Sequence, residues 1–247
     1  MAISIPKQVG YEFIAEREKQ HVQRARAQLQ KAPGLELLGP TDGERLPIFS
    51  LRFRSDKGEL HYGVVLQLLN DLFGIQARGG CLCAAPSGHT LLDLTPEHSE
   101  ALATEVRRGF GCLRPGWVTF NLHWLSTVEE ADYVLSAMKL IARWGNRLLP
   151  SYTLDTKTTL WQHRDHHEAP PASRDNFMLA KTPAASSANF PSPAELLKVA
   201  EQTLLNGAAH HHLQATEAHQ KKPWPSKAEA LCWFLRPHEL TKTSESL

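Results

Sequence analysis

The sequence predicts a small domain of mixed helix and strand, either α+β or α/β. Three observations carry this prediction: stretches of alternating polarity, stretches between them with apolar residues at helical spacing, and a change of composition after residue 163. We therefore expect one domain over residues 1–163, a linker without stable structure over residues 164–191, and a short helical or irregular tail over residues 192–247.

The first half of the predicted domain contains two helices and a strand. Residues 7–31 carry charge throughout, with apolar side chains at the spacing of an amphipathic helix. Residues 47–54 (PIFSLRFR) alternate in polarity, which indicates a strand with one buried face. Residues 60–73 return to a helical period, and Gly74 is a favourable C-cap because glycine adopts left-handed backbone geometry without strain.

The second half repeats this alternation. Residues 95–110 open with Thr-Pro-Glu, so Thr95 is the predicted N-cap of a helix. Residues 117–123 follow a Pro-Gly turn and alternate in polarity, as a strand does. The core candidates, chosen from periodicity alone, are Ile48, Leu66, Leu69, Val118, Phe120, Leu135 and Met138.

Capping patterns predict two further helices. Ser126 and Glu129 have the spacing of a capping box, and the helix that they open extends to about Gly145. Ser192 is the predicted cap of another helix that extends through Asn206.

The composition excludes some classes of partner. A formal net charge of +1 gives no electrostatic attraction to nucleic acid or to an anionic membrane. No apolar run approaches the length of a membrane span, and the opening MAISIPKQVGYEF lacks the layout of a signal peptide. Four cysteines in 247 residues do not form a disulfide framework, so we expect a cytoplasmic protein whose thiols stay reduced.

The stretch ARGGCLCAAPSGH, residues 77–89, carries the candidate chemistry. A metal site needs three or four ligands, and Cys81-x-Cys83 with His89 nearby lacks such a spacing, so we expect no metal. A disulfide between the two cysteines would close a very small, strained ring. Two alternatives stay open: both cysteines are small, partly buried residues of a glycine turn, or one is a reactive thiol whose thiolate is favoured by the guanidinium of Arg78.

Several segments together resemble one protein family. They are KQVGYEFIAERE, PGLELLGP, LPIFSLRF, LLNDLFGIQARGGCLCAAPSGH and GWVTFNLHWLSTVEEADYVLSAMKLIA. Over roughly residues 5–165 the chain resembles the smaller, C-terminal domain of class V aminotransferases, which are fold type I pyridoxal-phosphate (PLP) enzymes and include the cysteine desulfurases. The resemblance implies an α+β fold with a small antiparallel sheet backed by helices, followed here by a loosely structured C-terminal extension.

The most specific part of the resemblance is Arg78-x-Gly80-x-x-Cys83-Ala84. It is similar to the loop that carries the sulfur-accepting cysteine in one group of desulfurases. The resemblance places Cys83 at the nucleophile position, with Cys81 as the second candidate and Arg78 beside them.

One departure from the family concerns the cofactor. The family binds PLP in its larger domain, through a lysine that follows a histidine, and this sequence contains no His-Lys pair. Its opening residues also correspond to the helix that links the two domains of the family. We therefore expect PLP in the intact family, but no cofactor-binding residue and no bound cofactor in this chain alone.

A second departure concerns the substrate. The family places an arginine that grips the substrate carboxylate where this sequence has Thr119, which supplies neither the charge nor the bidentate fork. Arg114, on the preceding turn, and His89 are secondary candidates for contacts with a substrate.

Three functional hypotheses follow. The chain is an incomplete PLP-enzyme module that is inactive alone, a binding or scaffold domain that kept the fold and lost the chemistry, or a complementing half that assembles with a separately encoded PLP-binding domain. The expected partner is that domain or a second copy of the chain, and we expect neither nucleic acid nor a membrane. A neighbouring reading frame that encodes a PLP domain would favour the third hypothesis.

Limited proteolysis is expected to cut first within residues 165–190. Their Pro, Ala and Ser content buries too little apolar surface to offset a chain entropy of about 1–2 kcal/mol per residue. Time-resolved digestion followed by mass spectrometry measures the order of cuts. Protection of this segment while residues 1–150 are digested would contradict the prediction.

Overall fold

The computed structural model describes residues 4–40, 42–81, 85–165, 191–207 and 224–240. The predicted linker, residues 164–191, therefore lies almost wholly outside the described residues, and so does Cys83. Within the described residues, no helix combines the length and the apolar character that crossing a membrane requires.

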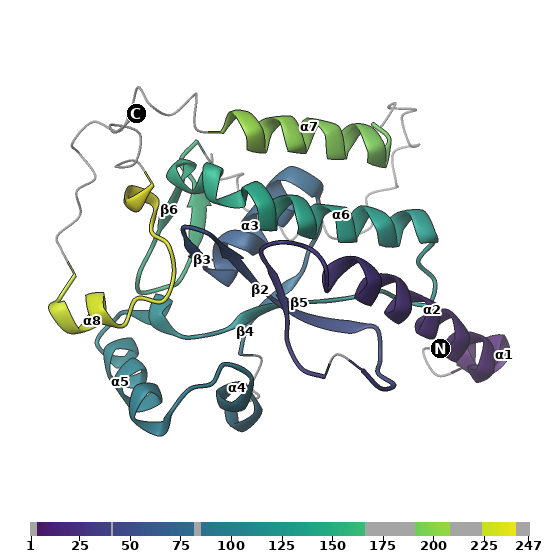
Figure 1. Ribbon diagram of the computed structural model, residues 1–247, viewed down its shortest axis with the longest axis horizontal. Coiled ribbons are helices and arrows are strands. Elements are labelled where there is room, and N and C mark those ends of the chain that lie inside the picture. Colours follow the sequence, from purple (N-terminus) through teal and green to yellow (C-terminus); the bar gives the residue numbers. More distant parts are fainter. Residues whose placement is uncertain (1–3, 41, 82–84, 166–190, 208–223, 241–247) are drawn as a thin grey trace, which may run out of the picture.

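An antiparallel sheet forms the centre of the molecule (Figure 1). Its strands follow the order β1-β2-β5-β4, and β3 pairs with the end of β2 on the edge opposite β1, the edge that also carries β5. The strands are β1 (Leu35–Leu37), β2 (Ile48–Ser55), β3 (Gly58–Leu60), β4 (Arg78–Gly80) and β5 (Trp117–Asn121). A separate antiparallel hairpin consists of β6 (Tyr152–Leu154) and β7 (Trp161–His163). The expected α+β fold with a small antiparallel sheet is confirmed.

Helices lie on both sides of this sheet (Figure 1). One side carries α2 (Tyr11–Leu29), α3 (Tyr62–Phe73), α6 (Val128–Trp144) and α7 (Pro193–Asn206). The other side carries α4 (Ala85–Leu91) and α5 (Pro96–Arg107), with α8 (Ser226–Ala230) next to α5. Short elements complete the described chain: α1 (Ser4–Val9) and the 3-10 helices η1 (Gly111–Leu113), η2 (Gly145–Ser151) and η4 (Pro237–Glu239).

The predicted helix over residues 7–31 is divided in two. Gly10 separates α1 from α2 and has a φ of 96°, which lies outside the helical region and which glycine adopts without strain. Beyond this break, Val22, Ala25 and Leu29 face the core, as the helical spacing predicted. Val9 and Phe13 belong to the same apolar pattern but are 38 % and 56 % exposed, so the expectation is wrong for these two residues.

The alternation in β2 decides which of its side chains enter the core. Phe49, Leu51 and Phe53 are buried against the helices, and each contributes about 1.5–3 kcal/mol of burial free energy. Ile48 is 45 % exposed, so its selection as a core residue was wrong. It shares its face of the strand with Ser50, because successive side chains point to opposite faces.

The other core candidates agree better with the structure. Leu66 is only partly buried and packs at the edge of the core. The remaining candidates are buried, namely Leu69, Val118, Phe120, Leu135 and Met138.

Three predicted helix ends are confirmed. Thr95 accepts a hydrogen bond from the backbone N–H of His98, and Gly74 takes the left-handed conformation at the end of α3. Ser192 forms a reciprocal capping box with Glu195 at the start of α7.

The capping box of α6 lies one residue later than predicted. Thr127 Oγ1 accepts from the backbone N–H of Glu130 at 3.1 Å, and a Glu130 carboxylate oxygen accepts from the N–H of Thr127 at 2.8 Å. The predicted box of Ser126 and Glu129 is wrong because the N–H of Ser126 already closes the preceding turn on His123. Two overlapping Ser/Thr-x-x-Glu patterns occur here, and the turn selects the second.

Residues 224–240 contain little regular structure, yet they pack firmly on the domain. Phe234 and Leu235 are buried, and the N–H of Leu235 donates to the carbonyl of Glu59 at 2.8 Å. The indole N–H of Trp233 donates to the carbonyl of Leu113 at 3.1 Å. No apolar period in the sequence indicates this docking, because the packed side chains lie in a short irregular segment.

A buried histidine joins the body of the domain to this segment. His61 caps α3 by accepting from the N–H of Gly63, and its Nδ1 also accepts from the indole N–H of Trp161 at 2.9 Å. Its Nε2 lies 3.1 Å from the carbonyl oxygen of Cys112, and its ring packs on those of Trp233 and Phe234. Burial lowers the pKa of His61 to about 3.

The stability of the protein is therefore expected to fall as the pH drops below about 6.5, in part because of His61. The unfolded chain binds a proton at this histidine near its ordinary pKa, whereas the folded chain does so only near pH 3. Between these values His61 contributes a loss of about 1.4 kcal/mol per pH unit. Urea unfolding at several pH values measures how the free energy of unfolding changes with pH.

The His61→Asn variant should show a shallower pH dependence than the parent protein over this window. The other titratable groups are the same in both proteins. The difference between the two slopes of unfolding free energy against pH therefore gives the contribution of His61. Identical slopes would contradict the prediction, because they would show that folding does not lower the pKa of His61.

Candidate functional site

The face of the sheet turned away from α3 and α6 carries polar side chains at its centre. Thr119 on β5 is the Cα partner of Arg78 on β4 and of Ser50 on β2. The hydroxyl oxygens of Ser50 and Thr119 lie 3.3 Å apart. Arg78 and Thr119, predicted from separate parts of the sequence, are thus brought together. The Arg78 side chain is exposed and makes no hydrogen bond or ion pair with any residue that the structure describes.

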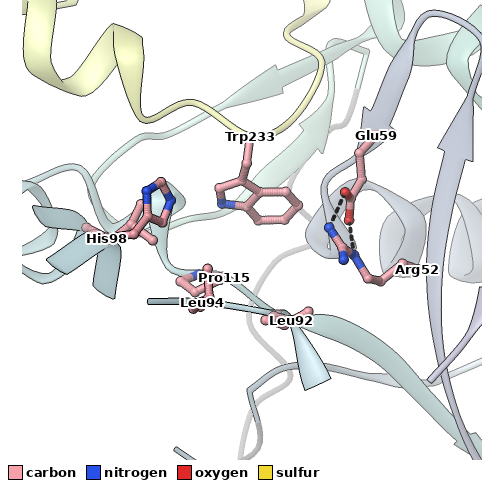
Figure 2. A pocket seen from close by; sticks show the side chains of 9 residues that line it. Arg52, Glu59, Leu92, Leu94, His98, Pro115 and Trp233 are labelled. Carbon is pink, nitrogen blue, oxygen red and sulfur yellow. Dashed lines mark hydrogen bonds and ion pairs between the residues drawn. The ribbon is translucent and has the colours of Figure 1, made fainter. Parts of the chain in front are cut away.

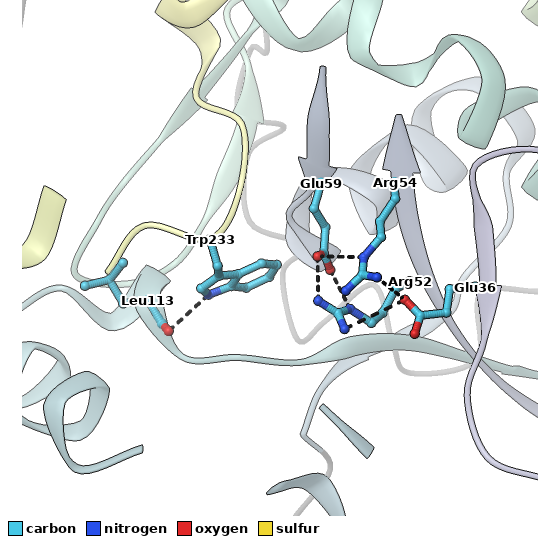
Figure 3. Close-up of polar contacts among 6 residues, drawn as sticks. All are labelled: Glu36, Arg52, Arg54, Glu59, Leu113 and Trp233. Atoms are coloured by element: carbon cyan, nitrogen blue, oxygen red, sulfur yellow. Dashed lines mark hydrogen bonds and ion pairs between the residues drawn. The ribbon is translucent and has the colours of Figure 1, made fainter. Parts of the chain in front are cut away.

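A second group of charges occupies the β3 side of the same face (Figure 3). Arg52 donates two hydrogen bonds to the carboxylate of Glu59, at 2.8 and 2.6 Å. Arg54 contacts both Glu59 and Glu36, with its nearest oxygen on Glu36 at 2.9 Å. The side chain of Arg52 is 15 % exposed and its charge is balanced within this group, so it is not free to hold an anionic ligand.

The helices α4 and α5 flank an open cavity of about 350 Å³ next to the sheet. Its polar lining comes from Cys81, His89, Ser99, Arg107 and Arg114. Its apolar lining comes from Leu92, Leu94, Leu102, Ala103, Val106 and Pro115, and Gly88 adds backbone. Three of the sequence-predicted residues, Cys81, His89 and Arg114, therefore meet at one cavity.

Glycines explain why Cys81 and Arg114 come close. A Cβ atom at Gly116 would lie 2.5 Å from the Cα of Gly80, so the two backbones touch only because residue 116 has no side chain. Cys81 directly follows Gly80, and Arg114 lies two residues before Gly116. The contact between the two glycines thus places the thiol-bearing residue and the guanidinium-bearing residue at one wall.

The remaining walls are fixed by contacts between the two helices. His89 Nε2 on α4 and Ser99 Oγ on α5 are 3.0 Å apart and share a hydrogen bond. The connection between the helices turns at Asp93, whose φ of 52° is left-handed. Leu102 on α5 is buried and anchors that helix to the domain.

A smaller cavity of about 50 Å³ adjoins the first (Figure 2). The two cavities share Leu92, Leu94, Leu102 and Pro115. In Figure 2 the ring of Trp233 lies between His98 and the Arg52–Glu59 pair. Residues of the C-terminal segment therefore complete a wall next to the candidate site.

The sequence did not predict several residues of the site. The amphipathic pattern of α5 identifies Arg107 and Ser99 as lining residues only once the position of α4 is known. Arg52 lies on the polar face of a predicted strand, which could have marked it as a candidate. Nothing in the sequence marked Trp233 as a residue of the site, because the residues around it show no helical or strand periodicity.

The residues that line these cavities do not fit PLP. The cofactor requires a lysine for its aldimine and an acid facing its ring nitrogen. No lysine is among the described lining residues of either cavity, and the one carboxylate there, Glu59, is bound by Arg52. Where the structure describes side chains, no group of three or more His, Cys, Asp or Glu residues is arranged to hold a metal ion.

Comparison with known families supports the resemblance in the first part of the chain. Residues 1–115 match the family model described as Aminotransferase class-V, a family of PLP-dependent proteins. The matched region includes β4, Cys81 and both helices of the cavity, and it ends at Pro115, before Thr119. No curated protein sequence matches the chain.

Alkylation is expected to distinguish the cysteines. Burial raises the pKa of Cys112 to about 12, and burial also raises the pKa of Cys232. Both thiols therefore stay protonated near pH 8, whereas we predict that the loop cysteines react first, and Cys83 before Cys81. Brief treatment of the native protein with iodoacetamide, read by peptide mass, measures the order. Preferential labelling of Cys81, Cys112 or Cys232 would contradict this prediction.

Proposed function

We propose that this chain is the C-terminal portion of a PLP-dependent protein similar to class V aminotransferases and cysteine desulfurases, and that it is not catalytically competent alone. One observation carries the proposal: the family match includes the loop of Arg78 and Cys81, while the cavity beside that loop lacks the groups that PLP needs. The chain thus carries the candidate nucleophile without the residues that would bind the cofactor.

The substrate side of the site supports the same conclusion. Thr119 occupies the position where the family has its carboxylate-binding arginine, and its hydroxyl faces that of Ser50. A bidentate charged contact is worth about 1.5–3 kcal/mol, which a threonine hydroxyl does not replace. Arg78, the Cα partner of Thr119, carries an exposed guanidinium on the same sheet face.

Under this proposal a second polypeptide supplies the cofactor. It is a separately encoded PLP-binding domain or a second copy of the chain, and it contacts the sheet face that presents Arg78 and Thr119. Cys81, Cys112 and Cys232 are free thiols, which supports the assignment to the cytoplasm, where thiols remain reduced.

One observation favours a second candidate, a binding or scaffold domain without catalysis. Trp233 and Leu235 attach the C-terminal segment to Leu113 and Glu59, at one end of the polar sheet face. The segment packs there as part of this domain's own structure, which suits a self-contained domain.

The purified chain is expected to show no stoichiometric PLP absorbance, and to release neither sulfide from cysteine nor a keto acid from an amino acid. Borohydride trapping after incubation with PLP, read by peptide mass, is the measurement, with an active class V aminotransferase as positive control. A single lysine labelled at one equivalent together with turnover would overturn the proposal. Gain of turnover on adding a separately expressed PLP-binding domain would favour a complementing half over a scaffold.

A further inference from the structure

We propose that the larger cavity binds a small amphipathic carboxylate, an organic acid with an apolar tail, and that this chain binds it without PLP and without a partner. The inference goes beyond the proposed function and does not depend on it. It concerns the space between α4 and α5 rather than a reaction at the cysteine loop.

The size of the cavity suits a small organic molecule. Its volume of about 350 Å³ falls at the lower end of the range in which proteins bind small ligands. The smaller cavity adds little room, but it extends the apolar surface through the shared residues Leu92 and Leu94.

The inner walls favour an apolar tail. Ala103 and Val106 lie on α5 and are only partly buried, although they line the cavity. Leu92 and Leu94, from the connection between the helices, are also partly buried. Covering these aliphatic surfaces removes apolar area from water, which contributes about 25 cal/mol per Å².

The charged groups of the lining favour an anionic head. Arg107 and Arg114 are the charged residues there, and no carboxylate is among the described residues that line this cavity. Arg107 is engaged by Glu100 at 2.7 Å. Arg114 makes no side-chain hydrogen bond or ion pair with any described residue, so its positive charge remains uncompensated.

A carboxylate suits the guanidinium of Arg114. Its two oxygens match the planar fork of a guanidinium and form parallel hydrogen bonds. His89 and Ser99 already share a hydrogen bond, so the polar head is held mainly at Arg114. The apolar tail then extends along α5 towards Val106.

Octanoate is the probe for this site, titrated into the full chain by isothermal calorimetry without PLP. We expect saturable one-to-one binding of octanoate, and much weaker binding of acetate, which lacks the tail, and of octylammonium, which carries the opposite charge. Absence of octanoate binding, or equal binding of octylammonium, would overturn the proposal.

Two variants locate the bound probe. Arg114→Gln should weaken octanoate binding roughly ten- to a hundredfold, because a charged hydrogen-bonded pair is lost. Ala103→Phe should abolish binding, because Ala103 lines the cavity and a phenylalanine there would occupy the space of the ligand. The matched control is Arg143→Gln, which replaces an exposed arginine of α6 on the other side of the sheet. This variant should bind octanoate with the affinity of the parent protein.

Thermal unfolding of each variant confirms that the fold is intact. Arg114 is exposed, so its replacement should leave the unfolding temperature nearly unchanged. Unaltered octanoate affinity in both cavity variants would place the probe elsewhere and overturn the proposal. Because no cofactor is present, the outcome is independent of whether the chain can form a PLP enzyme.

Discussion

The antiparallel pairing of β2 with β5 is the constraint on which the rest of the structure depends. It aligns Phe49 with Phe120 and Leu51 with Val118, and the two phenylalanine rings stack with their centroids 5.3 Å apart. Because side chains alternate along a strand, this register fixes at once which residues face the helices and which face α4 and α5. A shift of one residue would bury Ser50 and expose the core.

The same register arranges the charges of the site. It places Thr119 between Ser50 and Arg78, far from the Glu59 carboxylate that binds Arg52. Burial of Arg52 is tolerated because carboxylates surround it, whereas Arg78 and Arg114 remain exposed at the edge of the sheet. The positive charge available to a ligand therefore lies towards the cysteine loop and the cavity, not at Thr119 in the centre of β5.

The chain combines a loop that lies within the family match with a neighbouring cavity whose lining does not fit PLP. The match to class V aminotransferases ends at Pro115, and the cavity beside Cys81 contains aliphatic side chains and arginines in place of a lysine and an acid. A shared fold does not establish a shared activity, since activity depends on the groups at the site. The cavity between α4 and α5 is lined by this chain's own residues.

The sequence by itself determined the local features of this protein. Glycine and threonine caps ended or began α3 and α5 where expected, because capping depends on neighbouring residues, and polarity alternation located β2 and β5. Only the tertiary structure decided which of two overlapping capping boxes opens α6, that Ile48 faces outward, and that Trp233 completes a wall beside the site. It also decided that Cys81 and Arg114 line one cavity, because the contact between Gly80 and Gly116 joins segments whose distance in space no local pattern encodes.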